Sequence, residues 1–316
     1  MYKHITKEER ASIALLLSRK KSFAEIARVI GVHRTTIARE YHRNKESNGI
    51  YYAKKAHKHA KMRNCGKQDK HKIIENNADL YTYVTTSLSH YWSPEQIAGR
   101  IKRDGVLPSV SHTTIYAFMN RERKDLHKYK RHKKHRKHTE ISYKQAKKQM
   151  IDTRPTVIEK RSRIGDWEGD TIVGKERTER ILTHVDRKSG YLLAHRTKAD
   201  SHSVRMKVKN VFSVFPCNSI TYDNGSEFAA FEKIEEDIHT RVYFAYPGKP
   251  QQRGCNENAN GLLRQFFPKG SSFATITQRD VERVVVLINN RPRKRLGYRT
   301  PLEVFLEELG MMRLRV

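Results

Sequence analysis

The order of strands and helices in the C-terminal half constrains the fold of this chain most. Its apolar residues first alternate with period two, and later segments repeat with the period of a helix. The predicted elements are a strand at 166–173, a hairpin at 181–198, a helix at 201–215, a strand at 219–225, a short helix around 228–237, a strand at 241–247, and helices from Asn256 and from Gln278. Three meandering strands followed by alternating helices and strands predict a mixed α/β sheet with helices on both faces.

The charge of the chain points to a polyanionic partner. Its 316 residues include 64 Lys and Arg against 34 Asp and Glu, a net charge of +30, which favours binding to nucleic acid. No apolar run approaches the roughly 18 residues of a membrane span, and the apolar run at 11–18 has charged flanks unlike those of a secretory signal. We therefore expect no membrane contact and a cytoplasmic, nucleoid-associated protein. The three cysteines form no C-x-x-C pair, so we expect reduced thiols.

Residues 5–44 are predicted to form three helices with a helix-turn-helix. Thr6 with Glu9 and Ser22 with Glu25 match the capping box that marks a helix start. Gly31 suits the turn, and Ile37 would anchor the recognition helix. The residues expected to face DNA are His33, Arg34, Thr35, Thr36, Arg39 and Arg43. An ordinary three-helix bundle with solvated charges is the alternative.

A second copy of this motif favours the DNA-binding interpretation. The segment 22–27 is echoed at 93–98, and Thr35-Thr36-Ile37 recurs as Thr113-Thr114-Ile115. The second recognition helix would present His112, Thr113 and Thr114 to DNA. Between the copies, 51–64 is predicted to be a basic helix. The segment 72–88 is predicted to be amphipathic, and its apolar residues are Ile73, Leu80, Val84 and Leu88. Either helix could complete a bundle or serve dimerisation.

The segment 121–138 carries almost no apolar residue and is predicted to be a basic linker or an arm that follows DNA. The segment contains four histidines that could suggest a zinc site: His127, His132, His135 and His138. The neighbouring lysines and arginines disfavour a bound cation, so phosphate contact is the preferred interpretation. The predicted division is a first helix-turn-helix domain at 1–48, a second at 49–120, the linker at 121–154 and the α/β domain at 155–316.

Three carboxylates stand where secondary structure can hold them: Asp170 inside a strand, Asp223 at the end of another, and Glu257 near the start of a helix. If folding brings them together, they repel one another unless a cation joins them. An all-oxygen site favours Mg²⁺, or Mn²⁺ in its place. Asp166 and Glu168 share the strand parity of Asp170 and remain alternatives to it. Glu227 could replace Glu257 but is expected to cap a helix or face solvent.

The segments WEGDTIVG, TYDNGSEF and NENANGLLRQFFPKG, with the later GYRTPLEVF, resemble DDE transposases of the bacterial insertion-sequence family numbered thirty. Retroviral integrases are more distant look-alikes. Asp223 and Glu257 are separated by 257 − 223 − 1 = 33 residues, the interval that names this family. The resemblance implies a ribonuclease H-like catalytic domain after the helical N-terminal region. It also implies an enzyme that binds the terminal inverted repeats of its own mobile element, cuts double-stranded DNA at the ends, and joins them to target DNA.

The resemblance further implies roles for single residues. Asp170, chosen by the W-x-x-D pattern, would bridge two Mg²⁺ ions, Asp223 would bind one and Glu257 the other. Arg264 shares a helical face with Glu257 and Asn260, and the resemblance implies that it contacts the transferred DNA end, with Lys269 as a weaker companion. Asn224 and Gly225 suit a turn that aims Asp223, with glycine permitting positive φ.

Two other functions remain open from the residues alone. The many tyrosines leave a tyrosine recombinase open on composition, although the metal chemistry needs no covalent protein intermediate. A non-catalytic transcriptional regulator whose C-terminal half dimerises is the rival class, and the acid triad is what it would not need. Because two element ends must be held together, a homodimer or larger assembly on DNA is expected.

Overall fold

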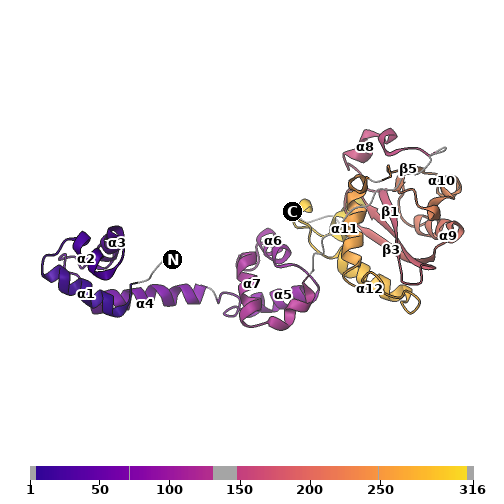
Figure 1. The fold of residues 1–316 in the computed structure, drawn as a ribbon. Helices are drawn as coiled ribbons and strands as arrows, with labels where there is room; N and C mark the ends of the chain where they lie inside the picture. The colour runs from indigo at the N-terminus through magenta and orange to yellow at the C-terminus, as the bar shows by residue number, and fades with distance from the viewer. Residues whose placement is uncertain (1–4, 71, 131–147, 248, 312–316) are drawn as a thin grey trace. The chain divides into compact units, whose positions relative to one another are not determined.

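The computed structural model describes residues 5–70, 72–130, 148–247 and 249–311 (Figure 1). It divides into two compact units, residues 1–78 and 79–316. Within the described residues, no helix is both long and apolar enough to cross a membrane.

The first unit is helical, as its capping boxes predicted. Its helices are α1 (Lys7–Ser18), α2 (Phe23–Ile30), α3 (Arg34–Asn44) and α4 (Ala53–Lys70). Thr6 and Ser22 each accept a hydrogen bond from the third helical residue, and both boxes are complete. Gly31 ends α2 at φ 74°, a left-handed conformation that glycine adopts without strain. Ile37 is fully buried in the core between these helices, so α3 is anchored as expected.

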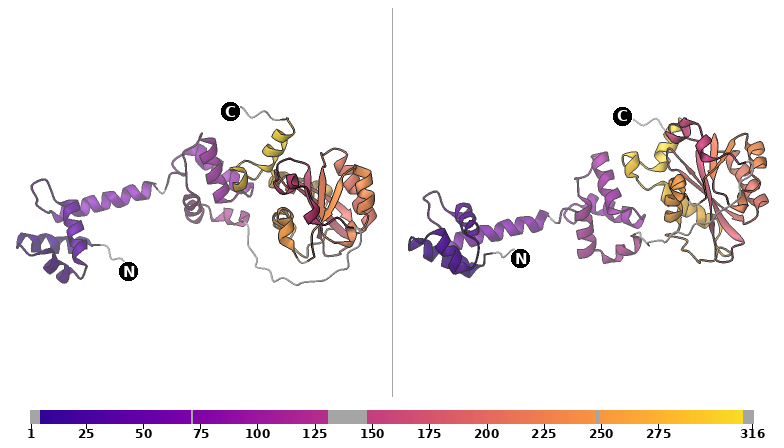
Figure 2. Two further views of the ribbon diagram at one scale, coloured as in Figure 1. Left: turned by 90° about the horizontal axis from the view of Figure 1, so that it is seen from above. Right: turned by 45° about the horizontal axis from the view of Figure 1, so that its top comes forward.

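Helix α4 belongs to this first unit. It forms one continuous basic helix (Figure 2), and it packs against α1. Tyr51 and Ala56 enter the same core as Ile13, and the Tyr51 hydroxyl donates to Glu40, which is ion-paired with Arg10 in the interior. The compact unit therefore runs past residue 48, where the sequence placed the end of the first domain.

The second unit begins with three helices, α5 (Ala78–Ser89), α6 (Pro94–Asp104) and α7 (His112–Arg121). Ser93 caps α6 with Gln96 in the expected box, and Pro94 is its first residue. The prediction of one amphipathic helix over 72–88 was wrong at its start. Residues 72–76 form a turn in which Ile74, and not Ile73, is buried.

The beginning of the predicted linker is ordered. A 3-10 helix at Lys124–Tyr129 buries Leu126, which the charge pattern did not indicate. Of the four histidines, His127 is half-buried and lies next to Lys130. His132, His135 and His138 lie outside the described residues.

The C-terminal part of this unit contains a five-stranded sheet in the order β3-β2-β1-β4-β5. Its strands are β1 (Asp166–Val173), β2 (Glu179–Asp186), β3 (Leu192–Lys198), β4 (Ser219–Tyr222) and β5 (Arg241–Phe244). The first three strands form an antiparallel meander, and β4 and β5 continue parallel to β1. This is the ribonuclease H-like arrangement that the sequence predicted.

Helices cover both faces of the sheet, as expected (Figure 1). One core joins strand residues such as Trp167 to α9 and α10, and the other joins Ile172 and its neighbours to α11 and α12. The remaining elements are α8 (Thr156–Glu159), α9 (Ser201–Phe212), α10 (Phe231–Ile238), α11 (Gly254–Leu263), α12 (Gln278–Asn289) and α13 (Pro301–Glu308), with 3-10 turns at Ile151–Thr153, Ser226–Phe228, Pro250–Arg253 and Lys294–Leu296. The second face, with α11, is the one that carries the candidate site.

Candidate active site

Asp170 lies on β1 with its side chain toward α11. It has the parity of Ile172, which packs against that helix, since alternate strand residues share a face. Asn260 on α11 donates from its amide to Asp170 Oδ2 at 2.7 Å. Thr183 on β2 donates to the amide oxygen of the same Asn260 at 3.2 Å, which fixes its orientation. The hydrogen bonds from α11 and β2 therefore fix the orientation of the Asp170 side chain.

Asp223 directly follows β4, the parallel neighbour of β1. Its Oδ1 accepts the Gly225 amide N–H at 3.0 Å, and Asn224 donates to the carbonyl of Ala245 at 2.8 Å. The turn therefore aims Asp223 as predicted, but not through positive φ, because Gly225 has φ −57°. A Cβ at Gly225 would lie 2.5 Å from the Glu227 carboxylate and 3.0 Å from Asp223 Oδ1, so a larger residue would displace these side chains.

Arg253 joins the two aspartates. Its guanidinium donates to Asp223 Oδ2 at 3.1 Å and lies 3.8 Å from Asp170 Oδ2. It also donates to the Gly169 carbonyl on β1 at 3.0 Å. The side chains of Asp170 and Asp223 are 23% and 39% exposed, so both remain accessible from solvent. The structure therefore places one cation between two carboxylates at adjacent parallel strands.

The electrostatics of Asp170 reflect this crowding. Burial raises its pKa to about 6. The guanidinium of Arg253 opposes that rise, and the carboxylates of Asp223 and Glu227 add to it. A group in this position gains most from a nearby positive charge, because the cation stabilises its ionised form.

Glu257 lies in the first turn of α11, one turn before Asn260, and is exposed. Within the part of the chain that the structure describes, its side chain makes no hydrogen bond or ion pair, and no three His, Cys, Asp or Glu side chains are grouped so as to hold a metal ion. The structure thus brings together Asp170 and Asp223 but does not join Glu257 to them. Asn260 is on the same face of α11 and contacts Asp170, so this face is directed toward β1.

The rival acids are all committed to ion pairs. Asp166 and Glu168 are fully buried, and they pair with Arg163 and Arg187. Glu227 was expected to cap a helix or face solvent, and this was wrong. It is buried, accepts from Thr171 and pairs with Arg180, because the 3-10 turn after β4 folds it back against β1.

Two basic residues at the site, Arg253 and Lys148, were not predicted from the sequence. Lys148 donates to the side chain of Asn224 at 3.1 Å, next to Asp223, and its Nζ lies over the Phe244 ring. A basic residue four positions before Glu257, at the start of the same helix, was the one available signal for Arg253. Nothing in the pattern around Lys148 indicated its place.

Arg264, predicted to contact the DNA end, makes contacts within the protein at the end of α11. Its guanidinium donates to the carbonyl of Val173 at the end of β1, at 3.0 Å, and approaches the carbonyls of Phe267 and Pro268. In this structure it links the end of α11 to the end of β1. Lys269 is exposed.

Both predicted recognition helices present polar faces. On α3, residues Arg34, Thr35, Arg39 and Arg43 are exposed and Thr36 is half-buried. On α7, His112 and Thr113 are exposed and Thr114 is half-buried, with its amide donating to the capping Ser111 hydroxyl. These side chains are free of the cores that Ile37 and Ile115 anchor.

Known proteins resemble the chain along most of its length. A helix-turn-helix domain family matches residues 1–44. The transposase for insertion sequence element IS4351 of Bacteroides fragilis is 37% identical over 96% of this chain and 96% of its own length. The transposase InsI for insertion sequence element IS30A of Escherichia coli (strain K12) is 34% identical over 95% of this chain and 83% of its own length.

Among solved structures, the catalytic core domain of BIV integrase covers 46% of this chain and 96% of its own, with 20% identity and a TM-score of 0.38. The family assignment comes from the two transposases, whose similarity spans the helical region and the sheet together. The chain belongs to the IS30 family of insertion-sequence transposases.

Proposed function

We propose that this DNA transposase binds the terminal inverted repeats of its element and cuts and joins DNA strands at a site made by Asp170, Asp223 and Glu257. The observation that carries the proposal is the pair Asp170 and Asp223 sharing the guanidinium of Arg253 beside α11. Two carboxylates that converge on one cation have the charge and donor chemistry of a divalent-metal site. The transposase relatives disfavour a non-catalytic regulator.

The donor set fits a hard cation. Asp170 and Asp223 offer carboxylate oxygens, and the described residues place no cysteine or histidine ligand with them. Asp170, Asp223 and Glu257 would hold two Mg²⁺ ions, with Mn²⁺ as a substitute. When bound, such ions activate the attacking oxygen and stabilise the leaving oxygen of an in-line displacement at phosphorus.

The other side chains prepare this site. Asn260 orients Asp170 through its 2.7 Å hydrogen bond. Arg253 neutralises Asp170 and Asp223 and would have to release them when a stronger cation arrives. Lys148 adds positive charge next to Asp223, where a DNA phosphate would approach. Arg264 and Lys269 are retained as proposed contacts to the DNA end.

DNA binding is assigned to the two helix-turn-helix units, which would use α3 and α7. The residues proposed to contact DNA are Arg34, Thr35, Thr36, Arg39, Arg43, His112, Thr113 and Thr114. The net charge of +30 would draw the protein to the phosphates of the nucleoid, in the bacterial cytoplasm. A dimer or larger assembly follows from the need to hold two ends; light scattering that finds one protomer on two ends would contradict it.

The proposal is tested by incubating the protein with labelled terminal-repeat duplexes, in Mg²⁺ and in EDTA. We expect site-specific cutting and joined products that require Mg²⁺ and persist in Mn²⁺. The proposal would be contradicted if the protein bound these ends but cut them in neither Mg²⁺ nor Mn²⁺, and if divalent ions did not change its thermal stability. That result would favour a regulator.

Replacing Arg253 with Gln should make the fold depend more on divalent ions. Without Mg²⁺, the variant leaves Asp170 and Asp223 facing each other without their shared cation, so we expect the midpoint of thermal unfolding to fall by about 2 °C. Added Mg²⁺ should raise that midpoint more in the variant than in the wild type. Arg241→Gln, an exposed substitution at the start of β5, is the control. Equal Mg²⁺ responses in variant and wild type would contradict the proposed role of Arg253.

A further inference from the structure

The late segment GYRTP holds an aromatic residue in an unfavourable conformation. Tyr298 has φ 62°, in the left-handed region that bulky residues rarely enter, and Gly297 before it has φ 61°. The loop is closed by a bridge between Arg293 and Arg299 and by the 3-10 turn Lys294–Leu296. The chain thus forms a tight projection with the Tyr298 side chain at its end.

The Tyr298 ring lies directly against α6, the first helix of the second helix-turn-helix motif. A Cβ at Gly99 would be 2.1 Å from the nearest ring carbon, so only glycine leaves room for this contact. Glycine is also among the least favourable residues in a helix interior. The contact between Tyr298 and Gly99 therefore accounts for both the unfavourable φ of Tyr298 and the presence of glycine inside α6.

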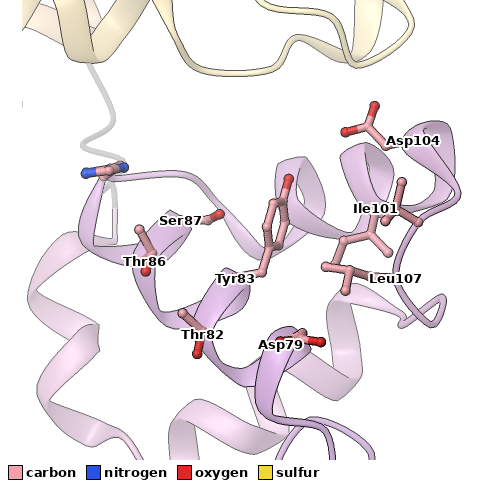
Figure 3. A pocket seen from close by; sticks show the side chains of 10 residues that line it. Asp79, Thr82, Tyr83, Thr86, Ser87, Ile101, Asp104 and Leu107 are labelled. Atoms are coloured by element: carbon pink, nitrogen blue, oxygen red, sulfur yellow. The ribbon is translucent and has the colours of Figure 1, made fainter.

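Polar contacts also join α6 to the C-terminal segment. Arg100 pairs with Glu303 of α13 at 2.8 Å, and Gln96 donates to the carbonyl of Pro292 at 2.8 Å. Arg100 also pairs with Asp104 at 2.7 Å. Asp104 lines a pocket of about 730 Å³ between α5 and α6, shown with Tyr83 in Figure 3. One face of α6 is thus bound to the catalytic part, and Asp104 links that face to the pocket.

A second set of contacts reaches the helix that carries the candidate site. Tyr91, also at positive φ, packs its ring against Phe266 with 4.7 Å between centroids. Arg291 lies over both rings, at 5.6 Å and 5.5 Å. Phe266 follows α11 by three residues. The second helix-turn-helix motif therefore contacts the segment that directly follows the helix bearing Glu257 and Asn260.

We propose that Tyr298, Gly99 and Arg100 are positioning residues, which fix the second helix-turn-helix unit on the catalytic domain so that α7 sets the distance from its DNA site to the cut. This inference rests on the proposed function, because it assumes that α7 binds DNA and that the carboxylates cut it. When the second helix-turn-helix motif is held at Tyr298 and at Tyr91, DNA bound by α7 reaches the active site with one fixed phosphodiester at the carboxylates. Without these contacts, the position at which α7 binds DNA would no longer determine the position of the cut.

A double-mutant cycle on the full-length protein tests the docking. In the wild type, Gly99→Ala should lower the midpoint of thermal unfolding by about 2 to 10 °C, because the new methyl group meets the Tyr298 ring. In the Tyr298→Gly background the same change should be neutral or stabilising, because alanine favours the helix and no ring opposes it. Tyr298→Gly also removes the strained φ, so the cycle does not depend on a misfolded variant.

The functional arm compares footprints with cuts on terminal-repeat duplexes in Mg²⁺. Tyr298→Gly should keep the α7 footprint, while cutting at the wild-type phosphodiester falls at least about ten-fold or spreads over neighbouring positions. The inference is overturned if Gly99→Ala has the same effect on stability in both backgrounds, or if Tyr298→Gly cuts at the same bond with the wild-type rate. A wild type that binds but never cuts would instead defeat the proposed function, and the stability cycle would still decide the docking.

Discussion

Asp223→Asn should abolish Mg²⁺-dependent strand cutting and leave the binding of element ends unchanged. The substitution keeps the size of the side chain and its contact with the Gly225 amide, but it removes the negative charge that would bind a metal ion. Loss of a metal's contribution to the transition state is worth several kcal/mol, which corresponds to a fall in cutting rate of about 10³-fold or more. The measurement is the rate of cutting on labelled ends, beside a gel-shift titration of the same DNA.

The control for this experiment is Asp237→Asn. Asp237 lies on α10, and its carboxylate pairs with Arg205, so this change removes one acid from the same domain without touching β1 or β4. It should leave the cutting rate within about two-fold of the wild type. Cutting by Asp223→Asn at the wild-type rate, with normal binding, would contradict the assignment of the site.

Local signals predicted the elements well. The alternation of residues 166–173 predicted β1 with its observed bounds, and capping boxes at Thr6 and Ser22 marked the starts of α1 and α2. These signals are reliable because each depends on neighbours within a turn or along one strand. The helix predicted from residue 72 began too early because apolar spacing cannot distinguish a turn that buries Ile74 from the first turn of a helix.

The contacts that define the site were less accessible to prediction. One face of β1 carries three acids, Asp166, Glu168 and Asp170, and they differ in the residues that they contact. Asp166 pairs with the exposed Arg163 and Glu168 pairs with the buried Arg187, whereas Asp170 faces α11 and Asp223. Arg253 and Tyr298 act on residues far away in the sequence, so no local periodicity reports their roles.

The identity of the third acid leads to the second large prediction. Glu257→Gln should reduce cutting by about 10³-fold or more, by the same loss of metal-binding charge, and should leave the free energy of unfolding within about 0.5 kcal/mol of the wild type. The reason is that Glu257 is exposed and, within the described residues, has no partner that stabilises the fold.

Glu227→Gln is its matched counterpart, and the opposite result is expected. Glu227 pairs with Arg180 and accepts from Thr171, and both ends of the ion pair are largely buried. Removing its charge leaves the Arg180 guanidinium without compensation in the interior, at a cost on the order of 2 to 4 kcal/mol of unfolding free energy. Because Glu227 also raises the pKa of Asp170, its loss should not by itself weaken metal binding there.

The two variants together decide which glutamate completes the site. Chemical denaturation gives the unfolding free energy of each, and cutting is compared at a temperature where both are folded. If Glu227→Gln loses cutting while Glu257→Gln retains it, the third ligand is Glu227 and the spacing of 33 residues is incidental. If Glu257→Gln alone loses cutting, α11 must bring Glu257 toward Asp170 and Asp223 when metal ions bind. Asn260, on the same face of α11, already contacts Asp170, so this face is the one that would approach the two aspartates.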